Sequence, residues 1–402
     1  MLLKSFFDKI YIIENIKMLK KNNNYKNSIK NGLSNFLDKL VQKNFKFNNK
    51  ALTLQDLKKR PNSSGAEVIN ICKANCSFCG YGKGKDGKAA DPRIKQKIDV
   101  KALKHLLKIY SDSGGGNFSL SPILGEVSAH PDWLNLVKEI KKYKNIRTTS
   151  CFTNATLLDR HGFKNILLSG LTTMTISTAL GNREQYKRLY GIDMYEKVKS
   201  NIINLLKENK KLNYPVDIYL ALRIDKPYNI FFNSSVYKEI IKYTERNRIT
   251  ILEVWDDFRG IIKKKGLPKG HEFKGLRYTN QRKNTPCYAL YRKLQILVDG
   301  TIQGCSCRIE PELWGKNIKD YKTLNEAWND KKIEKIRSDW FKGKLRNCCK
   351  ECSHYMPYEI LLKDGYLKSH LRTFFNKYLK RKVGINKLSS MNEEDRDMET
   401  RK

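Results

Sequence analysis

Short apolar runs rich in β-branched residues alternate with longer amphipathic stretches between residues 66 and 255. The short runs are typical of buried strands, whereas apolar positions repeated every three or four residues are typical of helices. Strands are predicted over 66–72, 117–123, 146–153, 172–178, 216–224 and 249–255. Helical spacing is clearest over 100–112, 132–143 and 194–209. Because each parallel strand pair needs a crossover connection, the pattern predicts an α/β fold, compatible with a partial (β/α)6 TIM-like barrel.

The pattern changes further along the chain, where a basic stretch rich in Gly and Lys predicts a linker. Two β-prone runs then flank Asp299 and Gly300, a pair that favours a hairpin turn. Thr323, followed three residues later by Glu326, predicts a capped helix over TLNEAWNDKKIEKIRSDWFKG. The predicted divisions are a core over 66–257, a linker over 258–286 and a β-hairpin plus helix module over 287–360.

The two ends of the chain differ in composition from this core. Residues 1–65 are rich in Lys and Asn and end in RPNSSG, which predicts an N-terminal extension. Apolar residues at helical spacing predict an amphipathic helix within it: Phe6, Ile10, Ile13 and Ile16. Docking of this helix on the protein itself is favoured, and docking on a partner or on a membrane surface is the alternative. Charged residues interrupt this run, so we expect neither a secretion signal nor a membrane span, and a cytoplasmic protein. Residues 361–402 are predicted to form a C-terminal helix and a polar tail.

Charge is the strongest departure from an average composition. The 402 residues, 40% of them hydrophobic, can bury one large core and one or more smaller ones. The 79 Lys and Arg against 41 Asp and Glu give a net charge of +38, which raises the question of a polyanionic partner. The basic residues are mostly Lys and are spread over nearly the whole chain. A nucleic-acid partner is therefore possible but not favoured.

Ten cysteines without an export signal favour metal or redox chemistry over a disulfide framework. Cys72, Cys76 and Cys79 follow the first predicted strand. A structural zinc site takes four protein ligands, whereas a [4Fe-4S] cluster held by three thiolates leaves one iron open. The sequence CKANCSFC, with Phe78 before the last Cys, resembles the CxxxCxΦC signature of the radical S-adenosylmethionine (SAM) superfamily. A zinc site is the alternative.

The resemblance to this superfamily covers most of residues 66–257 and implies further site residues. Gly125 and Glu126, within SLSPILGEVSAHPDW, resemble its GGEP-type segment. This implies that Glu126 accepts a hydrogen bond from the methionine amino group of SAM. Leu124 and Val127 depart from the pattern, because they replace the first Gly and the Pro. The stretch TNATLLDR is similar to the TNG-type segment after the third strand.

Two further SAM contacts are implied in the same way. ISTALGNREQYKRLYG resembles the family's segment after the fourth strand, in which a serine meets the SAM ribose. Ser177 is that serine here, although Ala179 stands where an Asp is common. Arg223, near the end of the fifth predicted strand, is a candidate contact of the SAM carboxylate or of the substrate. A structural ion pair is the alternative for Arg223.

A second group of cysteines lies in the C-terminal module. Cys287, Cys305, Cys349 and Cys352 flank the predicted hairpin and helix, and their spacing resembles the SPASM/twitch modules of radical SAM enzymes. This implies one auxiliary [4Fe-4S] cluster with four Cys ligands, for which a zinc site is the alternative. The neighbouring Cys307 and Cys348 could replace Cys305 and Cys349. Isolated in a strand, Cys151 is expected to be a small buried apolar residue.

The resemblance implies that a reduced cluster cleaves SAM to a 5′-deoxyadenosyl radical, which abstracts a substrate hydrogen. An electron donor such as flavodoxin or ferredoxin is implied as well. The auxiliary cluster would assist oxidation or binding, which fits peptide maturation as well as dehydrogenation or epimerisation of a sugar or another small molecule. The alternatives are an RNA-modifying radical SAM enzyme and a non-enzymatic zinc or iron–sulfur protein that binds nucleic acid.

Overall fold

The computed structural model describes residues 53–81, 91, 93–120, 124–273 and 283–359. All of them lie in one compact unit, Leu52–Lys402. The amphipathic helix predicted near the N-terminus and the C-terminal helix and tail fall outside the described residues. Within the described ranges, no helix is both long and apolar enough to cross a membrane.

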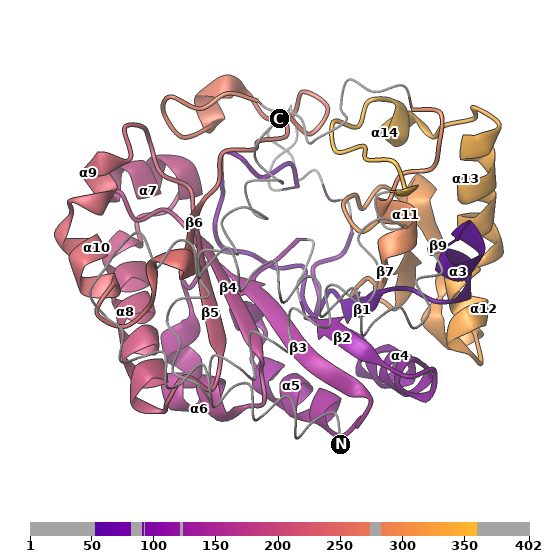
Figure 1. The fold of residues 1–402 in the computed structure, drawn as a ribbon, viewed down its shortest axis with the longest axis horizontal. Coiled ribbons are helices and arrows are strands. Elements are labelled where there is room, and N and C mark those ends of the chain that lie inside the picture. The colour runs from indigo at the N-terminus through magenta and orange to yellow at the C-terminus, as the bar shows by residue number, and fades with distance from the viewer. Residues whose placement is uncertain (1–52, 82–90, 92, 121–123, 274–282, 360–402) are drawn as a thin grey trace, which may run out of the picture. The chain divides into compact units, whose positions relative to one another are not determined.

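One sheet of nine strands carries the fold, in the order β6-β5-β4-β3-β2-β1-β7-β8-β9 (Figure 1). The strands of its first part are β1 (Ser63–Ala66), β2 (Gly116–Ser119), β3 (Ile146–Thr153), β4 (Thr173–Thr178), β5 (Asp217–Leu222) and β6 (Ile249–Ile251). Neighbouring strands are parallel, and their order in the sheet is the same as their order in the chain. The predicted parallel α/β fold is confirmed, and the unclosed sheet is consistent with a partial barrel.

Helices connect these strands on the outer side of the sheet (Figure 1). They are α4 (Val100–Asp112), α5 (Trp133–Lys141), α6 (Phe163–Leu168), α7 (Arg183–Tyr190), α8 (Tyr195–Lys211), α9 (Asn229–Phe232) and α10 (Ser235–Ile240). Helix α4 begins where the Asp99 carboxylate accepts hydrogen bonds from the backbone N–H groups of Lys101 and Ala102. It buries one apolar face, which includes Leu103 and Leu106, in the main hydrophobic core.

The C-terminal strands extend this sheet. Strand β7 (Lys293–Ile296) follows the short helix α11 (Ala289–Arg292) and pairs in parallel with β1. Strand β8 (Thr301–Gln303) pairs antiparallel with β7, and β9 (Trp314–Asn317) pairs antiparallel with β8. The predicted hairpin turn is confirmed, because Gly300 has a φ of +88° and the Asp299 carboxylate accepts from the Thr301 N–H. The hairpin therefore continues the core sheet beside β1.

Several predicted elements have different bounds; β6, for example, ends at Ile251 rather than at residue 255. Of the strand predicted over 66–72, only Ala66 lies in β1, and the chain then runs as a loop whose apolar Val68 and Ile69 are buried by packing. The helix predicted from Thr323 is two helices, α12 (Leu324–Trp328) and α13 (Lys331–Phe341). The capping box of Thr323 is confirmed. A second cap, Asp330, accepts from two backbone N–H groups and begins α13.

Segments on either side of the predicted core pack against it. Helix α3 (Leu54–Lys59) lies beside α12, where the Trp328 indole N–H donates to the Leu57 carbonyl at 2.8 Å. Of the predicted linker, residues 258–273 are described and include the 3-10 turn η5 (Lys264–Gly266). Within it, Ile262 and Leu267 are buried with Trp255 in a second apolar cluster. The predicted domain boundaries stay predictions.

Candidate active site

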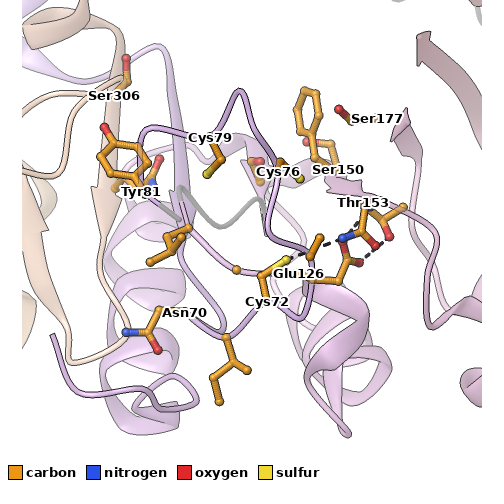
Figure 2. Close-up of a pocket in the computed structure, with 18 of the residues that line it drawn as sticks. Asn70, Cys72, Cys76, Cys79, Tyr81, Glu126, Ser150, Thr153, Ser177 and Ser306 are labelled. Atoms are coloured by element: carbon orange, nitrogen blue, oxygen red, sulfur yellow. Dashed lines mark hydrogen bonds between the residues drawn. The ribbon is translucent and has the colours of Figure 1, made fainter. Parts of the chain in front are cut away.

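A cavity of about 1090 Å³ opens at the carboxyl ends of the parallel strands. Side chains of the loop after β1, of the loop after β2 and of the ends of β3 to β5 converge there (Figure 2). The structure brings together every residue that the sequence predicts for the first site: Cys72, Cys76, Phe78, Cys79, Gly125, Glu126, Ser177 and Arg223. Ligands bind at this end of the sheet in α/β folds with parallel strands.

Backbone contacts hold the loop that carries the three cysteines. The N–H groups of Asn75 and Ser77 donate to the carbonyls of Tyr190 and Leu189, at the end of α7, each at 2.9 Å. The Ser77 hydroxyl donates to the Gly266 carbonyl at 2.7 Å. A sequence without regular secondary structure is thus fixed by the helix on one side and by the 258–273 segment on the other.

The three thiols lie in a poorly solvated setting. Burial raises the pKa of Cys72 to about 12, with smaller contributions from Glu126 and Cys79, and burial also raises the pKa of Cys76. A cationic metal centre reverses this preference, because it binds thiolates directly. Among the described residues, no three His, Cys, Asp or Glu side chains already converge as metal ligands would. The three thiols on one loop have the donor chemistry that an iron–sulfur cluster requires.

Glu126 is buried and lies at the centre of a hydrogen-bond network. Its Oε1 accepts from the Ser128 N–H at 3.1 Å, the Ser128 hydroxyl at 2.6 Å and the Thr153 hydroxyl at 2.5 Å. Oε2 accepts from the Asn154 N–H at 2.7 Å. Burial raises the pKa of Glu126, and these donors oppose the shift. Oε2 accepts a single hydrogen bond from the described residues, so it can take at least one more donor, such as an amino group.

Gly125 is needed for the position of this carboxylate. It has a φ of +109°, and a Cβ there would lie 2.2 Å from the carbonyl oxygen of Ile69. The next N–H, that of Glu126, donates to the Ile71 carbonyl at 2.9 Å. The segment thus runs directly against the loop that leads to Cys72. The departures from the family pattern at Leu124 and Val127 leave this close approach intact.

Arg223 directly follows β5 and lines the cavity. Its guanidinium is 4.6 Å from the centre of the Phe78 ring and donates to the Ser177 hydroxyl. Its Nε is buried without a hydrogen-bond partner, and in the described part of the chain no carboxylate pairs with it. The alternative of a structural ion pair is therefore not supported. A guanidinium, a carboxylate with a spare acceptor site and three thiols line one cavity, and this set fits the amino-acid end of SAM.

Sequence reasoning missed the groups that position Glu126. Ser128 and Thr153 bind its carboxylate, and Asn154 also places its side-chain amide 3.7 Å from the Cys72 sulfur. The segment TNATLLDR contains two of these residues, but its pattern names no partner for their side chains. Cys151 is buried in the core at 1% exposure, which confirms its predicted apolar role.

The second group of cysteines lies in the segments that flank the β7–β8 hairpin and in the segment around residues 347–352. The Cys307 N–H donates to the Cys305 sulfur at 3.4 Å, and the sulfurs of Cys348 and Cys349 lie 3.9 Å apart. Burial raises the pKa of Cys287 to about 12, with contributions from the nearby thiols of Cys307 and Cys352. The short helix α14 (Asn347–Lys350) carries Cys348 and Cys349. Cys305 and Cys348 are buried, and the other four are half-buried.

A buried ion pair joins the end of the β6 region to this second group. Asp256 accepts from the Arg308 guanidinium at 2.5 Å, from the His354 ring at 3.0 Å and from the Ser353 hydroxyl. Both members of the Asp256–Arg308 pair are at most 5% exposed. The Tyr81 hydroxyl, just after the first cysteine loop, donates to the Cys307 carbonyl at 3.2 Å. The two cysteine groups are thus structurally connected.

Comparisons with known proteins agree with this arrangement. Residues 66–222 match the sequence model of the radical SAM superfamily. The chain is 26% identical over 134 residues to a probable GTP 3′,8-cyclase of Saccharolobus islandicus, and the match spans 33% of this chain and 39% of that protein. Streptococcus suis SuiB bound to precursor peptide SuiA has a similar fold, with a TM-score of 0.52 and 18% identity over 88% of this chain and 83% of that chain.

Proposed function

We propose that the chain is a radical SAM enzyme, in keeping with the match of residues 66–222 to the model of that superfamily. In this proposal Cys72, Cys76 and Cys79 hold a [4Fe-4S] cluster beside a SAM molecule in the 1090 Å³ cavity. The observation that carries this proposal is that three thiols, Glu126 and Arg223 line one cavity although they lie far apart in the sequence. A three-thiolate set leaves one iron open for the SAM amine and carboxylate.

The residues of the cavity have separate tasks in this proposal. Glu126 accepts from the methionine amino group through Oε2, and Ser128 and Thr153 hold Oε1 in place. The Arg223 guanidinium, which lines the cavity, pairs with the methionine carboxylate. Ser177 lies at the end of β4, where its hydroxyl can meet the ribose. When bound, the cluster and SAM supply the one-electron chemistry that produces a hydrogen-abstracting radical, and the chain binds, orients and excludes water.

The C-terminal cysteines hold one auxiliary [4Fe-4S] cluster in the same proposal. Cys287, Cys305, Cys349 and Cys352 are the ligands, with Cys307 and Cys348 close enough to replace a neighbour. The auxiliary cluster assists oxidation or binding of a small-molecule or peptide substrate, and an electron donor such as flavodoxin or ferredoxin supplies the first electron. The packing of Tyr81 on Cys307 supports a substrate chamber bordered by both groups.

Iron content tests this assignment. After anaerobic reconstitution, the wild-type chain should hold about eight irons, as two cubane clusters require. Variants that lack Cys72, Cys76 and Cys79, or that lack Cys349 and Cys352, should each hold about four. Cys151→Ala removes a buried thiol that neither proposed cluster uses, so this variant should keep the full iron content. Bound zinc in place of iron in the wild type would contradict the proposal.

A further inference from the structure

The cavity continues from the SAM residues toward β1, β2 and β7. Strand positions two apart face the same side of a sheet, so alternate residues of these strands line the cavity. Those residues are small or polar: Ser63, Asn117, Ser119, Lys293 and Gln295. This part of the cavity has room for a ligand other than SAM. Of these five residues, Lys293 alone carries a charge.

Lys293 crosses the sheet at Gly65. It is the first residue of β7 and pairs with Ser63 of β1. A Cβ on Gly65 would lie 2.5 Å from the Lys293 Cε and 2.6 Å from its Nζ, so the missing side chain at Gly65 makes room for the lysine. No hydrogen bond or ion pair joins this ammonium group to another described residue. Desolvation, followed by the neighbouring charge of Arg292, lowers the pKa of Lys293 to about 7.

The charges that line the cavity are unbalanced. Five lining residues are basic and one is acidic: Lys73, Lys95, Arg223, Arg292 and Lys293 against Glu126. Glu126 already accepts hydrogen bonds from Ser128, Thr153 and Asn154, and Arg223 is assigned to SAM. Lys95 lies 3.6 Å from Asp91. The described residues place no carboxylate against Arg292 or Lys293. The nearby group that can carry negative charge is the Cys307 thiol, whose thiolate form raises the pKa of Lys293 and so opposes the downward shift.

Arg292 places this pair on the side of the second cysteine group. Its guanidinium lies 5.8 Å from the centre of the Tyr288 ring, and the Tyr288 hydroxyl lies 3.8 Å from the Cys307 sulfur. The two basic residues thus stand between the proposed SAM site and the proposed auxiliary site. A substrate bordered by both sites would meet them.

We propose that Lys293 and Arg292 bind an anionic group of the substrate, a carboxylate or a phosphate, so that the enzyme acts on an acidic molecule. Only the statement that this anion belongs to the substrate rests on the proposed function; the anion site itself does not. A desolvated ammonium group without a partner is unfavourable, and an anion supplies both the missing charge and the missing hydrogen bonds. The glycine at position 65 preserves this arrangement, since any larger residue would displace the lysine.

Affinity labelling of the full-length, reconstituted protein tests the proposal. Pyridoxal 5′-phosphate and uncharged pyridoxal share an aldehyde that condenses with an amine and is fixed by borohydride. The modified lysines are identified by peptide mass spectrometry. Pyridoxal is largely closed to a hemiacetal in water, so the rate of each aldehyde is expressed relative to its rate at exposed Lys101 of α4, the internal control. On this scale we expect the phosphate form to label Lys293 about tenfold faster than pyridoxal does, which is the worth of one charge-assisted hydrogen bond.

Competitors and variants complete the test. Inorganic phosphate or succinate should protect Lys293, and the more effective of the two identifies the anionic group. Arg292→Met should remove most of the preference for the phosphate form. Equal labelling by both aldehydes, absence of label at Lys293, or lack of protection by either anion would overturn the proposal. Labelling needs neither iron nor SAM cleavage, so its failure is distinguishable from failure of the proposed function.

Discussion

Replacing Glu67 by Gln should destabilise the protein strongly, because Glu67 is a fully buried carboxylate at the exit of β1. Arg93 donates to its two oxygens at 2.5 and 2.9 Å. The N–H groups of Leu124 and Val298 donate to it at 3.3 Å each. Breaking a buried pair from one side costs about 3–5 kcal/mol. Arg93 keeps a second partner, Asp91, at 2.8 Å, so we expect about 3 kcal/mol, the lower end of that range.

A double-mutant cycle measures this contribution. Urea unfolding would be followed for Glu67→Gln, for Arg93→Met and for the double variant. We expect the double variant to be more stable than the sum of the single effects predicts, by about 2 kcal/mol, because it leaves no unpaired charge at this contact. The exposed pair Arg183 and Asp193, joined at 2.8 Å, is the matched control and should show no coupling. Additive effects at Glu67 and Arg93 would refute the reasoning.

Further substitutions test the site and its support. Gly125→Ala, at a φ of +109° and 2.2 Å from a carbonyl, should weaken SAM binding in calorimetry at least about tenfold. Gly343→Ala is the control, because Gly343 has a φ of +70° and a Cβ there would meet nothing within 4 Å. It should lower the free energy of unfolding by about 1 kcal/mol and leave SAM binding intact. Equal SAM affinity of the Gly125→Ala and Gly343→Ala variants would contradict this. Asp256→Asn should leave buried Arg308 unpaired, cost about 3 kcal/mol in urea unfolding and lower the auxiliary iron content, so an unchanged unfolding midpoint would argue against it. Tyr81→Phe removes one hydrogen bond and should lower the free energy of unfolding by about 1 kcal/mol. An unchanged free energy would show that the contact to Cys307 does not stabilise the protein.

The sequence predicted the parts of the fold that depend on local pattern. Six parallel strands, the turn at Asp299 and Gly300, and the cap at Thr323 all have short-range signals, and the structure confirms each. The first cysteine group also has a short-range signal, its spacing, and the structure places its three residues in the lining of one cavity. Cys72 and Glu126 come together because both follow strands that end at the same edge of one sheet.

The rest depends on contacts that no local pattern encodes. The apolar run after Ala66 reads as a strand, but Val68 and Ile69 are buried by packing in a loop. Glu67 and Lys293 read as ordinary charged residues, and only the pairing of β1 with β7 brings them into the interior. The placement of β7 beside β1, more than 200 residues away in the chain, has no sequence signal in a single chain.

Reductive cleavage of SAM is the most direct test of the central claim. The reconstituted wild-type protein, incubated anaerobically with dithionite and SAM, should form 5′-deoxyadenosine and methionine in equal amounts. Cys72→Ala should form neither, whereas Cys151→Ala should retain the activity of the wild type. If the iron-loaded wild-type protein leaves SAM intact, or if Cys72→Ala cleaves it equally well, the assignment of the cavity to radical SAM chemistry is contradicted.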